Sequence, residues 1–272
     1  MHKILYALLV LGATACTNSR EKQNVITPAK ANGDGSFSAN GITLVPVRNS
    51  EKFYNAEVSW SNVQSHIEDD TFEFRFSVKN YALGAQTDDE NTGMCSNSDK
   101  GQHIHFILDS KPYTALYDTV YKTYLKPGEH ILLAFLSRSY HLSLKNEHAF
   151  ALHHFSSGNL KLMNKPIDMS SPMLFYSRPK GTYTGPKEIE RVLLDFYIVN
   201  TELKEGGNFV RATIDSASVF ELHRWQPYFV NGLGEGTHKI RLELCDADGK
   251  LISGPYTSET REIVLQAKNP LE

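Results

Sequence analysis

The sequence predicts an all-β protein of two tandem immunoglobulin-like β-sandwiches that follow a lipoprotein signal peptide and a flexible tether. Tyrosine and phenylalanine, which favour strands, number 13 and 14 among the 272 residues. Short apolar segments alternate with turn residues, and no long helical periodicity is present. The second half also repeats motifs of the first half in the same order. A net charge of −3 without a basic face argues against a nucleic-acid partner.

The N-terminus has the features of an export signal. A short positive region is followed by an apolar run at residues 4–11, which is too short to span a bilayer core of about 30 Å. The small residues Ala13, Thr14 and Ala15 then precede Cys16. This arrangement resembles the bacterial lipobox, which implies cleavage after residue 15 and a lipid on the Cys16 thiol. The alternative is an ordinary secretory signal in which Cys16 is incidental.

Residues 16–37 are predicted to form a disordered tether behind the lipid anchor. They are polar, contain proline, glycine and asparagine, and show no periodicity. Residues 17–22 lack a run of acidic side chains, which favours the periplasmic face of the outer membrane over the cell surface. We therefore expect a lipid-anchored protein of the bacterial cell envelope.

A first β-sandwich is predicted over residues 38–157. The clearest strand is 72–81, in which Phe72, Phe74 and Phe76 alternate with charged or polar residues, so that one face is buried. A long polar loop, residues 85–100, follows it. The other expected strands of this domain lie at 42–47, 56–60, 103–109, 113–117, 130–136 and 149–155.

A second sandwich, residues 158–272, is predicted from an internal repeat. Three segments recur in order: FSVKNYAL at 76–83 with FYIVNTEL at 196–203, ILDS at 107–110 with TIDS at 213–216, and KPGEHI at 126–131 with GEGTHK at 234–239. The alternative is two separate sandwiches that share only the general pattern of strands and turns. Residues present in both copies, such as His130 and His238, are expected to serve the fold, whereas chemistry confined to the first copy indicates function.

Histidines confined to the first copy predict a transition-metal site. His103 and His105 are two residues apart on a predicted strand, so both side chains point to one face. Two imidazoles side by side can bind zinc or copper, and His141 is the candidate third ligand. Met94 and Cys95 in the preceding loop would add sulfur ligands, which favour copper. The alternative is a set of histidines on a solvated sheet face.

The run Ser137, Arg138 and Ser139, together with His141, offers a different chemistry. A guanidinium flanked by hydroxyl groups and an imidazole can bind a phosphate or carboxylate. The run resembles the Ser-Arg-x-His element of forkhead-associated phosphopeptide modules, although here two residues separate the arginine from the histidine. With the 85–100 loop it predicts a protein-, peptide- or anion-binding module of adhesion type. The alternative is a polar turn with Arg138 in a surface ion pair.

Known catalytic motifs are absent from the sequence, which predicts a protein that is not an enzyme. There is no Gly-x-Ser-x-Gly, no His-Glu-x-x-His and no phosphate-binding glycine loop. Export permits a disulfide, but Cys95 and Cys245 fall in different predicted domains. We therefore expect two free thiols.

Three motifs together carry a family resemblance. They are G-Q-H-I-H-x-I-x-D at 101–109, P-G-x-H at 127–130 and S-R-S-x-H at 137–141. In these motifs the chain resembles a family of uncharacterised lipoproteins from Bacteroidetes-type bacteria, which automated labels often describe as phosphopeptide-binding. The resemblance implies an exported immunoglobulin-like fold. The sequence thus predicts an envelope lipoprotein that binds zinc or copper, or alternatively a peptide or anion, with a possible protein partner in the envelope.

Overall fold

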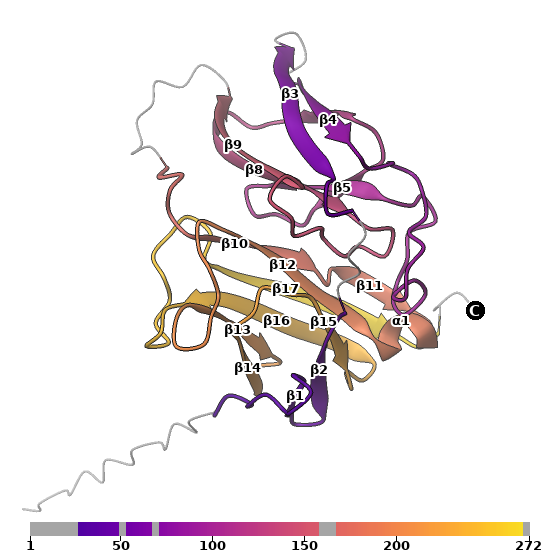
Figure 1. Cartoon of the computed structure of the whole chain (residues 1–272), viewed down its shortest axis with the longest axis vertical. Coiled ribbons are helices and arrows are strands. Elements are labelled where there is room, and N and C mark those ends of the chain that lie inside the picture. Colours follow the sequence, from indigo (N-terminus) through magenta and orange to yellow (C-terminus); the bar gives the residue numbers. More distant parts are fainter. Residues whose placement is uncertain (1–26, 49–52, 67–70, 158–166, 269–272) are drawn as a thin grey trace, which may run out of the picture.

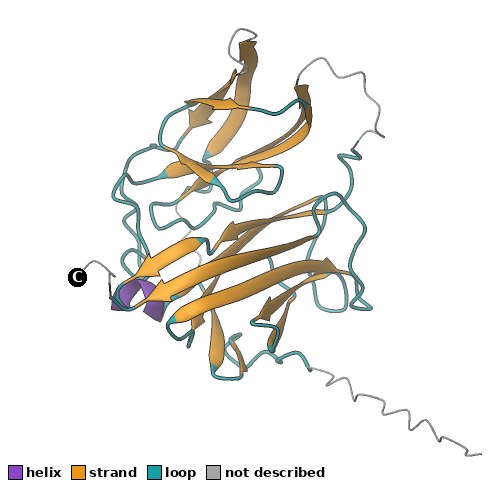
Figure 2. Cartoon of the chain, turned by 180° about the vertical axis from the view of Figure 1, so that it is seen from behind, coloured by secondary structure: helices purple, strands orange, loops and turns teal. Residues whose placement is uncertain are grey.

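The computed structural model describes residues 27–48, 53–66, 71–157 and 167–268. Within these ranges the secondary structure consists of strands β1 to β17 and one short helix, α1 (Pro186–Glu190). Figure 2 shows that strands make up almost all of the regular structure. The predicted all-β class is therefore confirmed.

The first sandwich contains two antiparallel sheets that enclose a hydrophobic core. The three-stranded sheet has the order β3 (Glu57–His66), β4 (Thr71–Lys79) and β7 (Val120–Tyr124). The four-stranded sheet has the order β6 (Thr114–Leu116), β5 (His103–Leu108), β8 (Gly128–Ser137) and β9 (Phe150–Ser157). Phe74 and Phe76 of β4 lie in this core, as the alternation in the sequence predicts.

The second sandwich contains two five-stranded sheets. One has the order β1 (Phe37–Ala39), β2 (Ile42–Pro46), β15 (Tyr228–Asn231), β12 (Val192–Val199) and β10 (Met173–Arg178). The other has the order β11 (Gly181–Thr184), β17 (Ser258–Gln266), β16 (Gly236–Cys245), β13 (Phe209–Ile214) and β14 (Ser218–Leu222). Figure 1 shows this larger sandwich below the first.

The strand orders of the two sandwiches agree with the predicted internal duplication. The orders β3-β4-β7 and β6-β5-β8-β9 recur as β10-β12-β15 and β14-β13-β16-β17, with β1, β2 and β11 added at the edges. Asp109 and Asp215 occupy the same turn, with left-handed φ values of 53° and 51°. Each carboxylate lies 2.8 or 2.7 Å from the ring Nδ1 of His130 or His238. These shared histidines therefore support turns, as expected.

The start of the first domain is not where the sequence placed it. Residues 38–46 were assigned to the first sandwich, but β2 pairs antiparallel with β15 of the second, with Leu44 opposite Val230. Leu44 and Phe37 are buried in the core of the second sandwich. The pairing covers an edge of β15 that would otherwise expose unpaired backbone groups, which gives this correction its physical reason.

The described part of the predicted tether is ordered against the second sandwich. The backbone N–H of Ala29 donates to the Val219 carbonyl at 2.8 Å, and Ser36 is 6% exposed. The prediction of a disordered segment is therefore wrong for residues 27–37, because Ala29 pairs with the edge of β14 and Phe37 is buried in the core of the second sandwich. The predicted signal peptide, the lipidation site Cys16 and tether residues 16–26 lie outside the described residues.

The two sandwiches share an apolar interface. Strand β8 is buried on both faces: Leu132, Ala134 and Leu136 point into the first sandwich, whereas Ile131, Leu133 and Phe135 point toward the second. Phe135 stacks on Tyr197 of β12, with ring centroids 4.8 Å apart. In Figure 1 the sheet that contains β5 and β8 accordingly faces β10 and β12. Burying this face removes further apolar surface from water and holds the sandwiches together.

A buried ion pair crosses the same interface. Lys145, in the connection from β8 to β9, donates from Nζ to Asp195 Oδ1 of β12 at 2.7 Å. Asp195 is fully buried and also accepts from the Ser143 backbone N–H at 3.0 Å. Lys145 Nζ donates further to the Phe196 carbonyl at 2.9 Å. Burial lowers the pKa of Lys145, and Asp195 opposes that shift. The pair thus fixes the first sandwich to the second through polar contacts as well as apolar ones.

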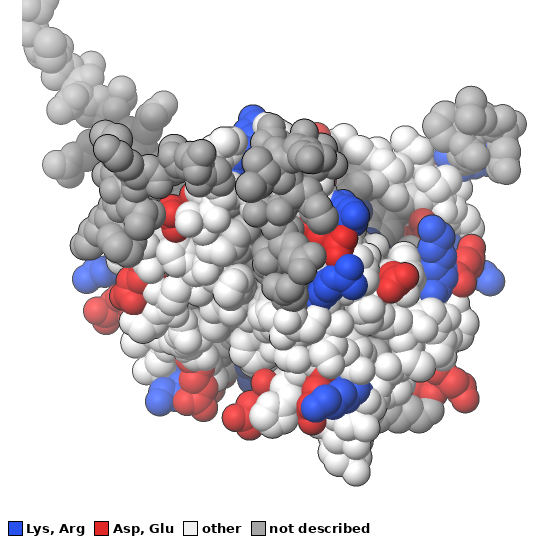
Figure 3. Space-filling view, turned by 90° about the horizontal axis from the view of Figure 1, so that it is seen from above, with Lys and Arg blue, Asp and Glu red and all other residues white. Residues whose placement is uncertain are grey.

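The face of the molecule seen in Figure 3 has no large patch of a single charge among the described residues. Basic and acidic side chains are interspersed over the surface seen in Figure 3. In the part of the chain that the structure describes, no helix has the length and hydropathy needed to span a bilayer.

Candidate metal centre

Two of the predicted metal ligands lie on β5, on the face that meets the second sandwich. His103 and His105 share this face with Ile107, whereas Ile104 and Phe106 enter the core of the first sandwich. Both histidines are 0% exposed. The prediction that they share a face is confirmed, and the alternative of a solvated face is wrong because the second sandwich covers it.

The orientation of His103 is set by a glycine two residues earlier. Gly101 has a left-handed φ of 81°, and a Cβ there would lie 2.4 Å from the Gly84 carbonyl oxygen. The Gly101 carbonyl accepts a hydrogen bond of 2.8 Å from His103 Nδ1. Because a carbonyl can only accept, Nδ1 carries the proton of the neutral ring, and Nε2 presents a lone pair.

The third predicted ligand meets the other two from the turn after β8. His141 has a φ of 69°, and its backbone N–H donates to the Arg138 carbonyl at 2.9 Å. His103 Nε2 lies 2.9 Å from His105 Nε2 and 3.1 Å from His141 Nδ1. One donor atom from each of the three residues lies within 4.8 Å of the others. The structure therefore brings the three predicted imidazoles together.

Residues that the sequence did not identify hold these rings in place. His105 Nδ1 lies 3.1 Å from the hydroxyl of Ser177, which belongs to β10 of the second sandwich. Tyr113 stacks on His105 with a centroid distance of 3.6 Å and an interplanar angle of 7°. Its hydroxyl lies 3.2 Å from His141 Nδ1. Tyr113 of the first sandwich and Ser177 of the second thus both support the histidine rings.

The spacing of the donor atoms is close to that of a metal site. Bonds of about 2.0–2.1 Å from Zn²⁺ to nitrogen place two donors about 3.3 Å apart in a tetrahedral arrangement. The separations of 2.9 and 3.1 Å around His103 Nε2 lie close to this value, and all three donor atoms lie within 4.8 Å of one another. A fixed outer hydrogen bond on a ligating histidine, as His103 has, is the usual support of such a site.

The three imidazoles are neutral at physiological pH. Burial lowers the pKa of His103 to about 4, against the opposing hydrogen bond to Gly101. Burial is also the main cause that lowers the pKa values of His105 and His141, and the cations of Arg178 and Lys180 add to it. Metal binding therefore needs no loss of a proton from these rings near pH 7.

The lowered pKa values predict acid sensitivity of the metal-free protein. Between the ordinary pKa of 6.5 and about 4, the unfolded chain binds protons that the folded site excludes, so stability is lost as the pH falls through this window. Each histidine contributes up to about 1.4 kcal/mol per pH unit there. Denaturant unfolding with a chelator should give a free energy that declines from about pH 6.5 downward. His103→Gln should decline less steeply, and equal slopes for both proteins would contradict the prediction.

The predicted anion site does not have the form that the sequence suggested. Arg138 is 2% exposed, and its Nη1 donates to Asp89 Oδ2 at 2.6 Å. Ser137 and Ser139 are fully buried, and the Ser139 backbone N–H donates to the hydroxyl of Thr87. The expected exposed guanidinium is therefore a buried partner of the 85–100 loop, because Asp89 of that loop folds back over it.

The predicted sulfur ligands lie apart from the histidine group. Cys95 points its thiol toward the Tyr140 carbonyl at 3.9 Å, and burial raises its pKa to about 12. Met94 is 36% exposed and lines a separate pocket of about 430 Å³ with Arg48. Cys95 does not belong to the converging group, and Met94 lines that other pocket instead. Cys95 and Cys245 are both free thiols, as predicted.

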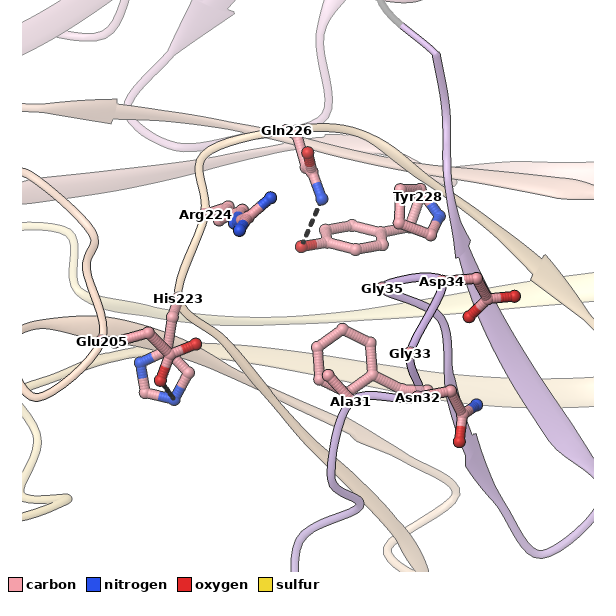
Figure 4. Close-up of a pocket in the computed structure, with 12 residues that line it drawn as sticks. Ala31, Asn32, Gly33, Asp34, Gly35, Glu205, His223, Arg224, Gln226 and Tyr228 are labelled. Carbon is pink, nitrogen blue, oxygen red and sulfur yellow. Dashed lines mark hydrogen bonds and ion pairs between the residues drawn. The ribbon is translucent and has the colours of Figure 1, made fainter.

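A second concavity, of about 390 Å³, lies between the ordered N-terminal segment and the second sandwich. Figure 4 shows Arg224, Gln226 and Tyr228 on one side of it, with Gln226 Nε2 donating to the Tyr228 hydroxyl at 3.2 Å. Glu205 and His223 lie on another side, 4.0 Å apart. Among the described ranges, only the three histidines form a converging group of potential metal ligands.

Comparisons with known proteins assign neither a family nor a ligand. No family model matches the chain, and no curated protein matches it. Fibronectin(III)-like modules of Clostridium thermocellum CbhA are 18% identical over 35% of this chain and 100% of theirs, with a TM-score of 0.28. The central fibronectin-III array of RIM-binding protein is 7% identical over 79% of this chain and 71% of its own, with a TM-score of 0.26.

A third similar structure is Bacteroides ovatus SGBP-B from a mixed-linkage glucan utilization locus, in complex with a mixed-linkage heptasaccharide. It is 10% identical over 77% of this chain and 60% of its own, with a TM-score of 0.21. All three TM-scores are low, so the assignment of two β-sandwiches rests on the strand orders described above.

Proposed function

We propose that this chain is a non-enzymatic metal-binding protein of the bacterial cell envelope. In this proposal His103, His105 and His141 hold one Zn²⁺ or copper ion between the two sandwiches. The observation that carries the proposal is the convergence of three buried ring nitrogens on one point. Both ring nitrogens of His130, which supports a turn, lie within hydrogen-bond distance of protein oxygens, whereas His103 Nε2 faces the nitrogens of two other rings.

The hydroxyl groups of Ser177 and Tyr113 can donate to His105 Nδ1 and His141 Nδ1, but they do not account for the close approach of two rings to His103 Nε2. The Gly101 carbonyl fixes the proton of His103 on Nδ1, so Nε2 has a single lone pair in the plane of the ring. Both His105 Nε2 and His141 Nδ1 approach that one atom. A metal ion accepts a lone pair from each of the three nitrogens, so two rings no longer compete for the lone pair of His103 Nε2. This supports a metal site over a hydrogen-bonded cluster.

The ligand set narrows the choice of ion. Imidazole nitrogen suits both zinc and copper, and Cu²⁺ generally binds nitrogen sites more tightly than Zn²⁺. The preference for copper that Met94 and Cys95 would have added has no support, because Cys95 does not join the group and Met94 lines a separate pocket. Three protein ligands leave a fourth coordination position for another molecule.

The contact of His105 with the second sandwich suggests a structural role for the ion, and the N-terminal sequence suggests the location of the protein. His105 contacts Ser177 across the interface, so an ion on His105 would stabilise the packing of one sandwich on the other. The N-terminal sequence supports an anchor at Cys16, on the periplasmic face of the outer membrane, where a protein partner could be reached. The resemblance to Bacteroidetes-type lipoproteins supports the same location.

Calorimetric titration of the full chain with Zn²⁺ and with Cu²⁺ tests the proposal. We expect saturation at one ion per chain, and a stabilisation of about 2.7 kcal/mol when the free ion reaches about 100 times its dissociation constant. His148→Ala, which removes an exposed histidine outside the group, should bind the ion normally. Absence of saturable binding for both ions would rule out this function.

A further inference from the structure

The histidine group lies beside a buried cation that has no anionic partner. Arg178, at the end of β10, is 7% exposed, and its Nη1 donates to the Tyr183 hydroxyl at 2.9 Å. Its Nε has no acceptor among the described residues, and no described carboxylate forms an ion pair with it. Asp195, its neighbour in the β10–β12 register, is instead bound by Lys145. Burying a guanidinium without a carboxylate partner is costly, and an anion bound beside Arg178 would lower that cost.

Tyr113 connects this cation to the histidines. The Arg178 guanidinium lies 5.6 Å from the centre of the Tyr113 ring, and the same ring stacks on His105 at 3.6 Å. Lys180 brings a second positive charge, since its Nζ lies 3.8 Å from that ring centre and donates to the Tyr113 carbonyl at 2.7 Å. Contacts with a ring offset part of a buried charge but do not neutralise it.

A divalent ion would enlarge the imbalance. The three imidazoles are neutral and contribute no negative charge, so an ion on them would be added to the charges of Arg178 and Lys180. Cys95 lies near enough to Arg178 to interact with its charge, but the thiol is directed at the Tyr140 carbonyl and burial raises its pKa to about 12, so that it stays neutral near pH 7. The fourth coordination position of the ion is the place where an external anion would offset all of these charges.

We propose that the metal binds together with a small oxyanion, a carboxylate or a phosphate, which occupies the fourth coordination position and accepts a hydrogen bond from Arg178. This inference rests on the proposed metal site. A guanidinium suits such an anion because its donors match the spacing of two oxygens on one carboxylate or phosphate group. The protein would then bind an anion only when it also carries the metal, or bind it far more tightly in that state.

Titration of the full chain with Co²⁺ tests the inference, because the visible absorption of Co²⁺ reports its ligands. The titration is made in a non-coordinating buffer, then with acetate or with inorganic phosphate at about 10 times the metal concentration. We expect at least one oxyanion to tighten Co²⁺ binding about tenfold and to change the spectrum. A response to acetate alone identifies a carboxylate site, and a response to phosphate alone identifies a phosphate site.

Arg178→Gln separates this role from a purely structural one. The variant should bind Co²⁺ without anion at least as tightly as the wild type, because a nearby cation is removed, and should lose the response to oxyanions. Arg241→Gln, at a half-exposed surface ion pair, should keep the response. Should Arg178→Gln fail to fold, Arg178→Lys retains the charge and should keep part of the response.

The two proposals fail in different ways. Co²⁺ binding that neither oxyanion affects in the wild type overturns the anion inference and leaves the metal function intact. An unchanged oxyanion response in Arg178→Gln overturns the role of this arginine. A spectrum altered by Cys95→Ser identifies the thiolate as the fourth ligand and also overturns the inference. Absence of Co²⁺ binding under every condition overturns the metal function and the inference together.

Discussion

Asp195→Ala is expected to lower the free energy of unfolding by about 3–5 kcal/mol, the usual cost of removing one partner from a buried ion pair. The carboxylate of Asp195 is fully buried, and its loss leaves the ammonium of Lys145 without its counter-charge. The Ser143 backbone N–H also loses its acceptor. Because this pair joins the two sandwiches, the variant should also bind metal more weakly, through displacement of Ser177 relative to His105.

Two controls isolate the charge effect in denaturant-unfolding experiments. Glu262→Ala breaks an exposed ion pair with Lys239 and should cost less than about 1 kcal/mol. The double variant Asp195→Leu with Lys145→Met removes both buried charges and should recover much of the lost stability. A cost for Asp195→Ala no larger than that for Glu262→Ala would show that the pair does not hold the interface.

His103→Ala is expected to abolish stabilisation by metal. His103 Nε2 lies between His105 Nε2 and His141 Nδ1. Its removal leaves only these two nitrogens to bind the ion. With the free ion at about 100 times its dissociation constant, the wild type gains about 2.7 kcal/mol and the variant should gain almost none. Melting curves with Zn²⁺, Cu²⁺ and a chelator measure the difference.

His130→Ala serves as the matched control for this experiment. His130 lies in the same sandwich and is 7% exposed, but its ring is engaged with Asp109 and the Lys126 carbonyl. We expect a lower melting temperature without metal and an unchanged increase with metal. Equal metal responses in the His103 and His130 variants would show that the histidine group is not the binding site.

Much of the fold follows from local patterns in the sequence. The alternation of Phe72, Phe74 and Phe76 with polar residues requires a strand with one buried face, and the structure has β4 there. The repeated turns at Asp109 and Asp215 have the same conformation and equivalent partners, because each aspartate accepts from a backbone N–H near the start of a long strand, β8 or β16.

Long-range pairing could not be predicted in the same way. Residues 42–46 have the pattern of a strand, but nothing local indicates that their partner is β15, almost two hundred positions later. The interface between the sandwiches did leave a signal. The run ILLAFL at 131–136 has no polar alternation, which is typical of a strand buried on both faces, and β8 is such a strand.

In the candidate site too, the residues of one sandwich could be predicted from the sequence, whereas the contacts between distant segments could not. The spacing of His103 and His105 and the position of His141 were sufficient to predict that three imidazoles of one sandwich lie together. Ser177 and Arg178 come from the other sandwich, and only the packing of β10 against β5 brings them near. Arg138 was misjudged for a similar reason, because its partner Asp89 lies 49 positions earlier in a loop with no regular pattern.

X-ray absorption spectroscopy of the zinc-loaded full chain identifies the atoms that bind the ion. We expect about three nitrogen ligands at about 2.0–2.1 Å that carry the outer-shell scattering of imidazole rings, with a light atom in the remaining position. A sulfur ligand at about 2.3 Å, or a spectrum with fewer than two imidazoles, would contradict this expectation.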